Sequence, residues 1–138
     1  MGRDSGASGL SAREITVGYG KDAPILEGLS LDVLEGELTV IVGPNACGKS
    51  TLLRCLARVL GARSGVVELD GVELGTMNQK ALARRLGLLA QSSVAPGDML
   101  VEDLVARGRY PHHGLVRQWS AVDDEAVAGA MRDAGVSA

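Results

Sequence analysis

The pattern of apolar and polar residues predicts two β-strands in the first part of the chain. In segment 28–37 (GLSLDVLEGE), three apolar residues at every second position are separated by polar ones. This alternation places the apolar side chains on one face, as in a half-buried strand of an antiparallel sheet. Segment 13–19 (REITVGY) predicts a second strand, and the Gly/Ser-rich residues 1–12 predict a disordered N-terminus before it.

Three further segments predict strands of other kinds. Residues 38–42 (LTVIV) are continuously apolar, which is typical of a strand buried on both faces in a parallel sheet. Residues 65–74 (GVVELDGVEL) predict a hairpin that turns at Asp70-Gly71. Residues 87–91 (GLLAQ) predict a short strand that ends at Gln91.

Helical spacing of apolar residues appears between and after these strands. In segment 49–60 (KSTLLRCLARVL), five apolar residues share one helical face. Shorter helices are predicted at 78–86, 101–108 and 121–135. Acidic residues 123–125 fall in the first turn of the last one, where the helix dipole favours negative charge.

Composition and charge narrow the possible function classes. The chain has 138 residues, 46 % of them hydrophobic, which suits one globular domain. A net charge of −3 argues against sequence-independent binding to a nucleic-acid backbone. No apolar run reaches the length of about 18 residues that predicts a membrane span, and no signal peptide is recognisable, so we expect a cytoplasmic protein. Cys47 and Cys55 are expected to be reduced thiols.

The strongest chemical signal is the segment 43–50, GPNACGKS, which fits the phosphate-loop pattern G-x-x-x-x-G-K-[ST]. Its glycines let successive backbone N–H groups point at phosphate oxygens, and the following helix adds the positive end of its dipole. We expect Lys49 to reach the β- and γ-phosphates, Ser50 to ligate Mg²⁺ and Thr51 to contact the α-phosphate. The predicted nucleotide is ATP, and its predicted contacts are Gly43, Pro44, Asn45, Ala46, Cys47, Gly48, Lys49, Ser50 and Thr51.

The run from this loop to the hairpin, GPNACGKSTLLRCLARVLGARSGVVELDG, resembles the nucleotide-binding domain of ABC transporters. The likeness extends over about residues 13–135. It implies an α/β P-loop NTPase fold with an antiparallel β subdomain, a partial parallel core and the start of a helical subdomain. By this resemblance, residues 13–138 would form the N-terminal part of such a domain.

The same resemblance suggests roles for two residues outside the phosphate loop. Tyr19 stands where the family places an aromatic ring that stacks on adenine. Gln91 stands where the family carries the Q-loop glutamine, which touches Mg²⁺ and the attacking water and couples the site to the membrane subunit. The resemblance therefore implies Lys49 and Gln91 as catalytic residues, and Ser50 with Gln91 as magnesium ligands.

A narrower resemblance concerns residues 101–115 (VEDLVARGRYPHHGL), which are similar to the start of the helical subdomain in importers of ferric siderophores, haem and cobalamin. It implies ATP-driven uptake of an iron-siderophore or related chelate, with a membrane permease subunit docked around Gln91 and residues 92–115. The full-length form is expected to pair with a second nucleotide-binding domain, as a homodimer, at the cytoplasmic face of the membrane.

Several residues in this segment lack a predicted role in the chemistry. We expect His112 and His113 to be exposed loop residues, and Arg107 and Arg109 to belong to a solvated face or to a partner contact.

The chain departs from the family pattern in what it lacks. It contains no LSGGQ-type signature, no acidic strand with a catalytic glutamate and no switch histidine. We therefore expect a truncated form that binds nucleotide at most and is inactive as an ATPase alone. Two alternatives remain open. One is a non-catalytic nucleotide-binding or dimerisation module; the other is a different P-loop enzyme such as a small-molecule kinase, which Tyr19 and the early strands disfavour.

Overall fold

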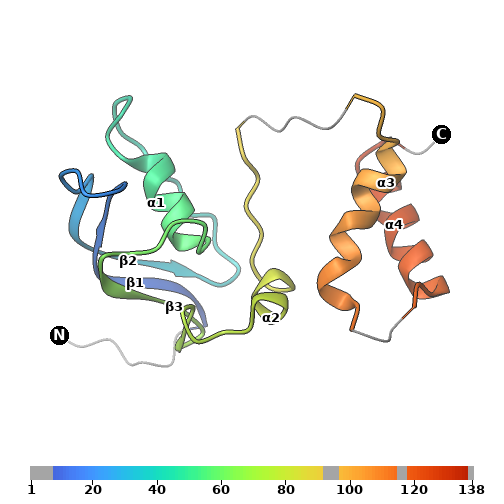
Figure 1. The fold of residues 1–138 in the computed structure, drawn as a ribbon, viewed down its shortest axis with the longest axis horizontal. Helices are drawn as coiled ribbons and strands as arrows, with labels where there is room; N and C mark the ends of the chain where they lie inside the picture. Colours follow the sequence, from blue (N-terminus) through green and yellow to red (C-terminus); the bar gives the residue numbers. More distant parts are fainter. Residues whose placement is uncertain (1–7, 92–96, 115–117, 137–138) are drawn as a thin grey trace. The chain divides into compact units, whose positions relative to one another are not determined.

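The computed structural model describes residues 8–91, 97–114 and 118–136 (Figure 1). The chain divides into two compact units. The first comprises Met1–Leu82 and Leu86–Leu88, and the second comprises Ala83–Arg85 and Leu89–Ala138.

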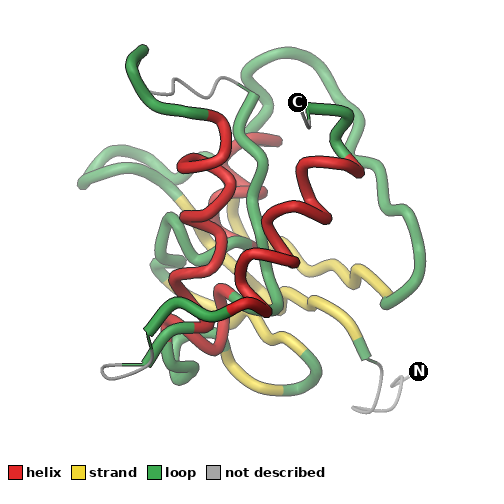
Figure 2. The backbone as a smooth tube through the Cα atoms, turned by 90° about the vertical axis from the view of Figure 1, so that its right-hand side faces the viewer, coloured by secondary structure: helices red, strands yellow, loops and turns green. Residues whose placement is uncertain are grey.

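A four-stranded antiparallel sheet forms the framework of the first unit (Figure 2). Its order is β2-β1-β3-β4, so the central strand β1 has neighbours on both sides. The alternation predicted around residues 29–33 is confirmed, since odd positions there are half-buried and even positions are exposed. The strands are β1 (Gly9–Val17), β2 (Leu26–Leu34), β3 (Ser64–Leu69) and β4 (Val72–Glu73).

The first strand begins earlier than its sequence pattern indicates. It starts at Gly9, whereas the composition predicted disorder through residue 12. Leu10 pairs with Val33 on one side and with Leu69 on the other, so the backbone of this polar segment finds hydrogen-bonding partners that its composition does not reveal. The first seven residues lie outside the described part of the chain.

The predicted hairpin is confirmed. Asp70 and Gly71 form the two-residue connection between β3 and β4, with φ angles of 50° and 75°. Two successive left-handed residues match the twist of the flanking strands. The Asp70 carboxylate also accepts a hydrogen bond from the Gly9 backbone N–H at 2.6 Å, which ties the turn to the start of β1.

The helix α1 (Lys49–Leu56) packs on the sheet and completes the core of the first unit (Figure 1). Its buried side chains Leu52, Cys55 and Leu56 share that core with Ile15 and Val17 of β1. The apolar helical face is therefore confirmed. The helix is shorter than predicted because Arg58, at φ 57°, adopts the left-handed conformation that ends helices. A second short helix, α2, spans Gln79–Ala83.

The predicted strands at 38–42 and 87–91 are wrong for this structure. Both segments are extended chain without a strand assignment, and Leu38 and Leu89 are 91 % and 93 % exposed. A strand of a parallel sheet needs hydrogen-bonded neighbours and cover on both faces. Among residues 8–91, 97–114 and 118–136, only β1–β4 form a sheet, so neither segment has such a neighbour.

The second unit is helical. It contains α3 (Val101–Ala106), the 3₁₀-helix η1 (Arg107–His112) and α4 (Ala121–Asp133), with α3 and α4 side by side (Figure 1). The predicted helices at 101–108 and 121–135 are thus confirmed, although the first one tightens into η1 at Arg107. In the part of the chain that the structure describes, no helix has the length and apolar character needed to cross a bilayer.

Candidate nucleotide-binding site

The phosphate loop leads directly into α1, and its backbone adopts conformations that favour glycine. Gly43, Ala46 and Gly48 have φ angles of 156°, 63° and 94°. A Cβ on Gly43 would lie 2.9 Å from Cys47 Sγ, and one on Gly48 would lie 2.8 Å from Leu26 Cδ2. The curl of the loop therefore favours glycine at these positions because of their φ angles, and a side chain at Gly48 would also have to displace Leu26 of β2.

The Lys49 side chain folds back into this curl. Its Nζ donates hydrogen bonds to the carbonyl oxygens of Gly43 at 2.9 Å and Pro44 at 2.5 Å, and it lies 3.5 Å from Cys47 Sγ. The first turn of α1 contains no acidic residue, so the positive end of the helix dipole is not neutralised there. A cation, a helix N-terminus and a glycine-shaped backbone together form a site that suits a triphosphate.

The two residues after Lys49 have different surroundings. Ser50 is exposed in the first turn of α1, where its hydroxyl can reach a metal ion or a phosphate. Thr51 is only 6 % exposed, and its side chain helps to lower the pKa of Tyr19. The contacts of Ser50 with Mg²⁺ and of Thr51 with the α-phosphate remain predictions.

The structure brings Tyr19 to the same helix. Its hydroxyl accepts a hydrogen bond from Arg54 Nη1 at 3.0 Å, while 41 % of the residue stays exposed. Hydrogen bonding to Thr51, and then to Arg54, holds the pKa of Tyr19 below its usual value. A partly exposed ring is thus held beside the helix that carries the phosphate loop, although its stacking on adenine remains a prediction.

Gln91 belongs to the second unit and is exposed. It follows extended chain and not the predicted strand, so its contacts with Mg²⁺ and water remain predictions. The described residues contain no group of three or more His, Cys, Asp or Glu side chains placed to hold a metal ion. A magnesium ion here would depend on ligands such as the Ser50 hydroxyl, phosphate oxygens and water, which is how Mg²⁺ commonly binds with nucleotides.

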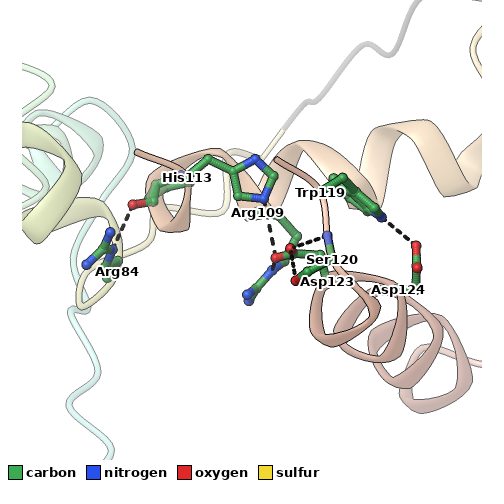
Figure 3. A network of polar contacts seen from close by, with 8 residues as sticks. Arg84, Arg109, His113, Trp119, Ser120, Asp123 and Asp124 are labelled. Carbon is green, nitrogen blue, oxygen red and sulfur yellow. Dashed lines mark hydrogen bonds and ion pairs between the residues drawn. The ribbon is translucent and has the colours of Figure 1, made fainter. Parts of the chain in front are cut away.

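A polar cluster in the second unit was not predicted (Figure 3). The fully buried Asp123 accepts hydrogen bonds from Arg109 Nε at 2.9 Å and from the Ser120 backbone N–H and hydroxyl at 3.1 and 2.7 Å. His113 Nε2 lies 3.3 Å from the same carboxylate, and the His113 ring meets Trp119 edge-on at 5.5 Å.

This cluster corrects two expectations. Arg109 does not belong to a solvated face, because it pairs with a buried carboxylate. The two histidines are not exposed loop residues, since both are half-buried and His112 lies in η1. Ser120 and Asp123 form a capping box at the start of α4. The sequence signal for that box was Ser-x-x-Asp immediately before a helical segment.

The Asp123 cluster predicts a specific acid sensitivity. The Ser120 hydroxyl, followed by Arg109 and His113, holds the pKa of Asp123 well below its usual range, although burial opposes the shift. A depressed pKa contributes stability above the unfolded carboxyl value of about 4, and this contribution is lost as pH falls toward the folded value.

We expect the thermal midpoint of helix unfolding to fall between about pH 5 and 3 more steeply in the parent than in Asp123→Asn. Far-ultraviolet circular dichroism, which reports helical content, measures this midpoint. Asp124→Asn is the matched control, because the Asp124 carboxylate is exposed and accepts a hydrogen bond from Trp119, outside the Asp123 cluster. Parallel pH profiles for the parent and Asp123→Asn would contradict this account of the cluster.

Comparison with known proteins places these features in a family. The family model for the ABC transporter matches residues 26–137. The chain is 47 % identical over 128 residues to the ferric enterobactin transport ATP-binding protein FepC of Escherichia coli (strain K12), covering 93 % of this chain and 47 % of FepC. It is 43 % identical to the probable siderophore transport system ATP-binding protein YusV of Bacillus subtilis (strain 168), over 92 % of this chain and 46 % of YusV. The chain therefore spans about half the length of the curated relatives it matches.

Solved structures agree with this assignment. A bacterial Atm1-family ABC exporter with ATP bound has a TM-score of 0.68 and 31 % identity, over 95 % of this chain and 22 % of that chain. An ATP-binding subunit of an ABC transporter has a TM-score of 0.75 over 94 % of this chain and 51 % of that chain; at 20 % identity it supports the fold alone. Since the family model covers most of the sequence, this chain belongs to the ABC transporter family and carries part of its P-loop NTPase fold.

Proposed function

We propose that residues 43–51 bind the triphosphate of Mg-ATP, and that the chain is the nucleotide-binding part of the ATP-binding subunit of an ABC importer. One observation carries the first half of this proposal. The Lys49 ammonium lies within a glycine loop at the N-terminus of α1, bonded to the carbonyls of Gly43 and Pro44. Phosphate oxygens are stronger acceptors for this ammonium than neutral carbonyls, so a triphosphate would replace them.

The residues around the loop would each contact a different part of Mg-ATP. Lys49 and the loop N–H groups would hold the phosphates, and Tyr19 would offer its ring to the base. Mg²⁺, held by Ser50 and in the assembled protein by Gln91, would supply positive charge to the phosphate oxygens. The exposed Ser50 and the acid-free first turn of α1 support this arrangement.

The role of Tyr19 predicts a clear difference between two substitutions. Tyr19→Ala removes the ring and should weaken ATP binding by about 1–3 kcal/mol, the usual contribution of a base–aromatic stack. Tyr19→Phe keeps the ring and should retain most of the affinity, and GTP should compete because stacking does not read base edges. Competition against a fluorescent ATP analogue measures both. Equal affinity of Tyr19→Ala and the parent would remove Tyr19 from the site.

We further propose that these 138 residues bind ATP without turning it over. They contain neither the signature loop nor the catalytic glutamate that the family reaction uses. Phosphate release from Mg-ATP should therefore equal that of the Lys49→Ala variant. Turnover that depends on Lys49 would show that the chain carries a catalytic group, and phosphate transfer to a small acceptor would instead favour a kinase.

The proposed cargo is a ferric siderophore or a related chelate, taken up through a membrane permease. The names of the relatives support this, since they include transport of ferric enterobactin and hemin import, the latter by a protein of Bordetella parapertussis that is 42 % identical. The full-length protein would act as a homodimer at the cytoplasmic face and would dock around Gln91 and residues 92–115, of which 92–96 and 115 lie outside the described residues.

Uptake assays test the cargo. A strain that lacks the full-length gene should lose uptake of one substrate among siderophore iron, haem and cobalamin, and the intact gene should restore it. Normal uptake of all of them would contradict the proposed cargo without affecting the nucleotide site.

A further inference from the structure

The loop that presents Tyr19 is held by an arginine that lies far from it in the sequence. We call residues 18–24, between β1 and β2, the Tyr19 turn. Arg63 Nη1 donates a hydrogen bond to the Asp22 carbonyl at 2.8 Å. Its Nη2 lies 3.1 Å from the Tyr19 carbonyl and 3.2 Å from the Gly20 carbonyl. One guanidinium therefore bridges both arms of the turn.

The arginine is itself anchored to the sheet. Its backbone N–H donates to the Thr16 carbonyl at 2.8 Å, next to the pairing of Thr16 with Ser64 of β3. Its guanidinium lies directly against Gly18, where a Cβ would be only 2.8 Å from Nη2. Glycine at this position thus leaves the space that the guanidinium occupies.

The other end of Tyr19 is held from a different element. Arg54 of α1 donates from Nη1 to the Tyr19 hydroxyl at 3.0 Å. Tyr19 is therefore fixed at its backbone by Arg63 and at its ring hydroxyl by Arg54, while 41 % of the residue stays exposed.

We propose that Arg63 is a positioning residue for base recognition, which holds the Tyr19 turn so that the ring is already in place when a nucleotide binds, with Arg54 as the second tether. The inference rests on the proposed binding of ATP and goes beyond it. A turn of this kind, with Gly20 at φ 53°, is free to sample many conformations unless its carbonyls are bonded. A loop that is ordered before binding avoids the entropy cost of ordering it in the complex.

The test distinguishes an effect on binding of the base from an effect on binding of the phosphates. Affinities for Mg-ATP and for magnesium tripolyphosphate, which has no base, are measured by calorimetry on the parent and on Arg63→Gln. We expect Arg63→Gln to bind ATP about fivefold more weakly, the factor expected for the smallest contribution of a base–aromatic stack. Its affinity for tripolyphosphate should not change.

Two further variants test whether the loss of affinity is specific to the Tyr19 turn. Arg58→Gln is the matched control, because Arg58 also holds a loop carbonyl in the first unit, that of Met77 at 2.7 Å, but not the Tyr19 turn. It should leave the ratio of the two affinities unchanged. Gly18→Ala should lower ATP affinity selectively, as Arg63→Gln does, because its methyl group displaces the guanidinium.

A double-mutant cycle completes the test. In a Tyr19→Ala background, Arg63→Gln should have no further effect on ATP affinity, because the ring that it positions is gone. Equal losses of ATP and tripolyphosphate affinity in Arg63→Gln would contradict the proposal and favour a phosphate contact or a general loss of folding. An unchanged ATP affinity would also contradict it. A parent that binds neither ligand would instead overturn the proposed function, and with it this inference.

Discussion

Replacement of Lys49 with alanine is expected to weaken Mg-ATP binding by about 1.5–3 kcal/mol, the scale of a hydrogen bond to a charged group. The ammonium that now bonds to the carbonyls of Gly43 and Pro44 is the only charged side chain within the loop segment 43–48 and the first turn of α1. Its loss leaves the backbone N–H groups and the helix dipole, which retain part of the affinity for phosphate.

Isothermal titration calorimetry of the parent and Lys49→Ala measures this difference. Lys80→Ala is the matched control, because it removes the same charge from α2, outside the loop. Equal affinity of the parent and Lys49→Ala would remove the lysine from the site, and a comparable loss in Lys80→Ala would show a general effect of net charge.

The largest effect on stability is expected from Gly65→Ala at the start of β3. Gly65 has a φ of 79°, and a Cβ there would lie 2.4 Å from the carbonyl oxygens of both Arg13 and Glu14. These oxygens belong to the backbone of β1, where the register with β3 shifts between Arg13 and Thr16. The methyl group can be accommodated only if the two strands separate, so we expect a loss of at least about 3 kcal/mol in the free energy of unfolding.

Gly71→Ala is the natural comparison for this variant. Gly71 has nearly the same φ of 75°, but a Cβ there would meet no atom within 4 Å. Its substitution should therefore cost only the backbone strain of a left-handed residue, about 1–2 kcal/mol. Denaturant unfolding of both variants measures the difference. Equal losses would show that the close contact between β3 and β1 does not limit stability.

Features that depend on neighbouring residues in the sequence were predictable. The Asp-Gly turn specifies its hairpin because two adjacent residues must adopt left-handed conformations. The phosphate loop is also a contiguous motif, and its glycines occupy the strained positions that the motif requires. The strand β2 was predictable for the same reason, since the period-two alternation of its own residues defines which face is buried.

Features that depend on distant partners were not predictable in the same way. Segment 38–42 has the composition of a buried strand, but burial requires neighbours that no local pattern can supply. Arg109 and Asp123 are 14 positions apart, and nothing in either flanking segment indicates that they pair. The same is true of Arg63 and the Tyr19 turn, which are separated by more than 40 positions. The predicted role of Tyr19 at the base likewise came only from the family resemblance.

The central claim is that ATP binds at residues 43–51, and amide resonances locate the binding directly. Mg-ATP is titrated into the isotopically labelled chain while the backbone amide shifts are followed by NMR. We expect saturable shifts of the amides of Gly43, of residues 45–51 and of Tyr19, because they surround the loop and the ring beside α1; Pro44 has no amide proton. Amides of the hairpin at Asp70-Gly71 should move little. Saturable shifts that leave residues 43–51 unchanged would contradict the claim.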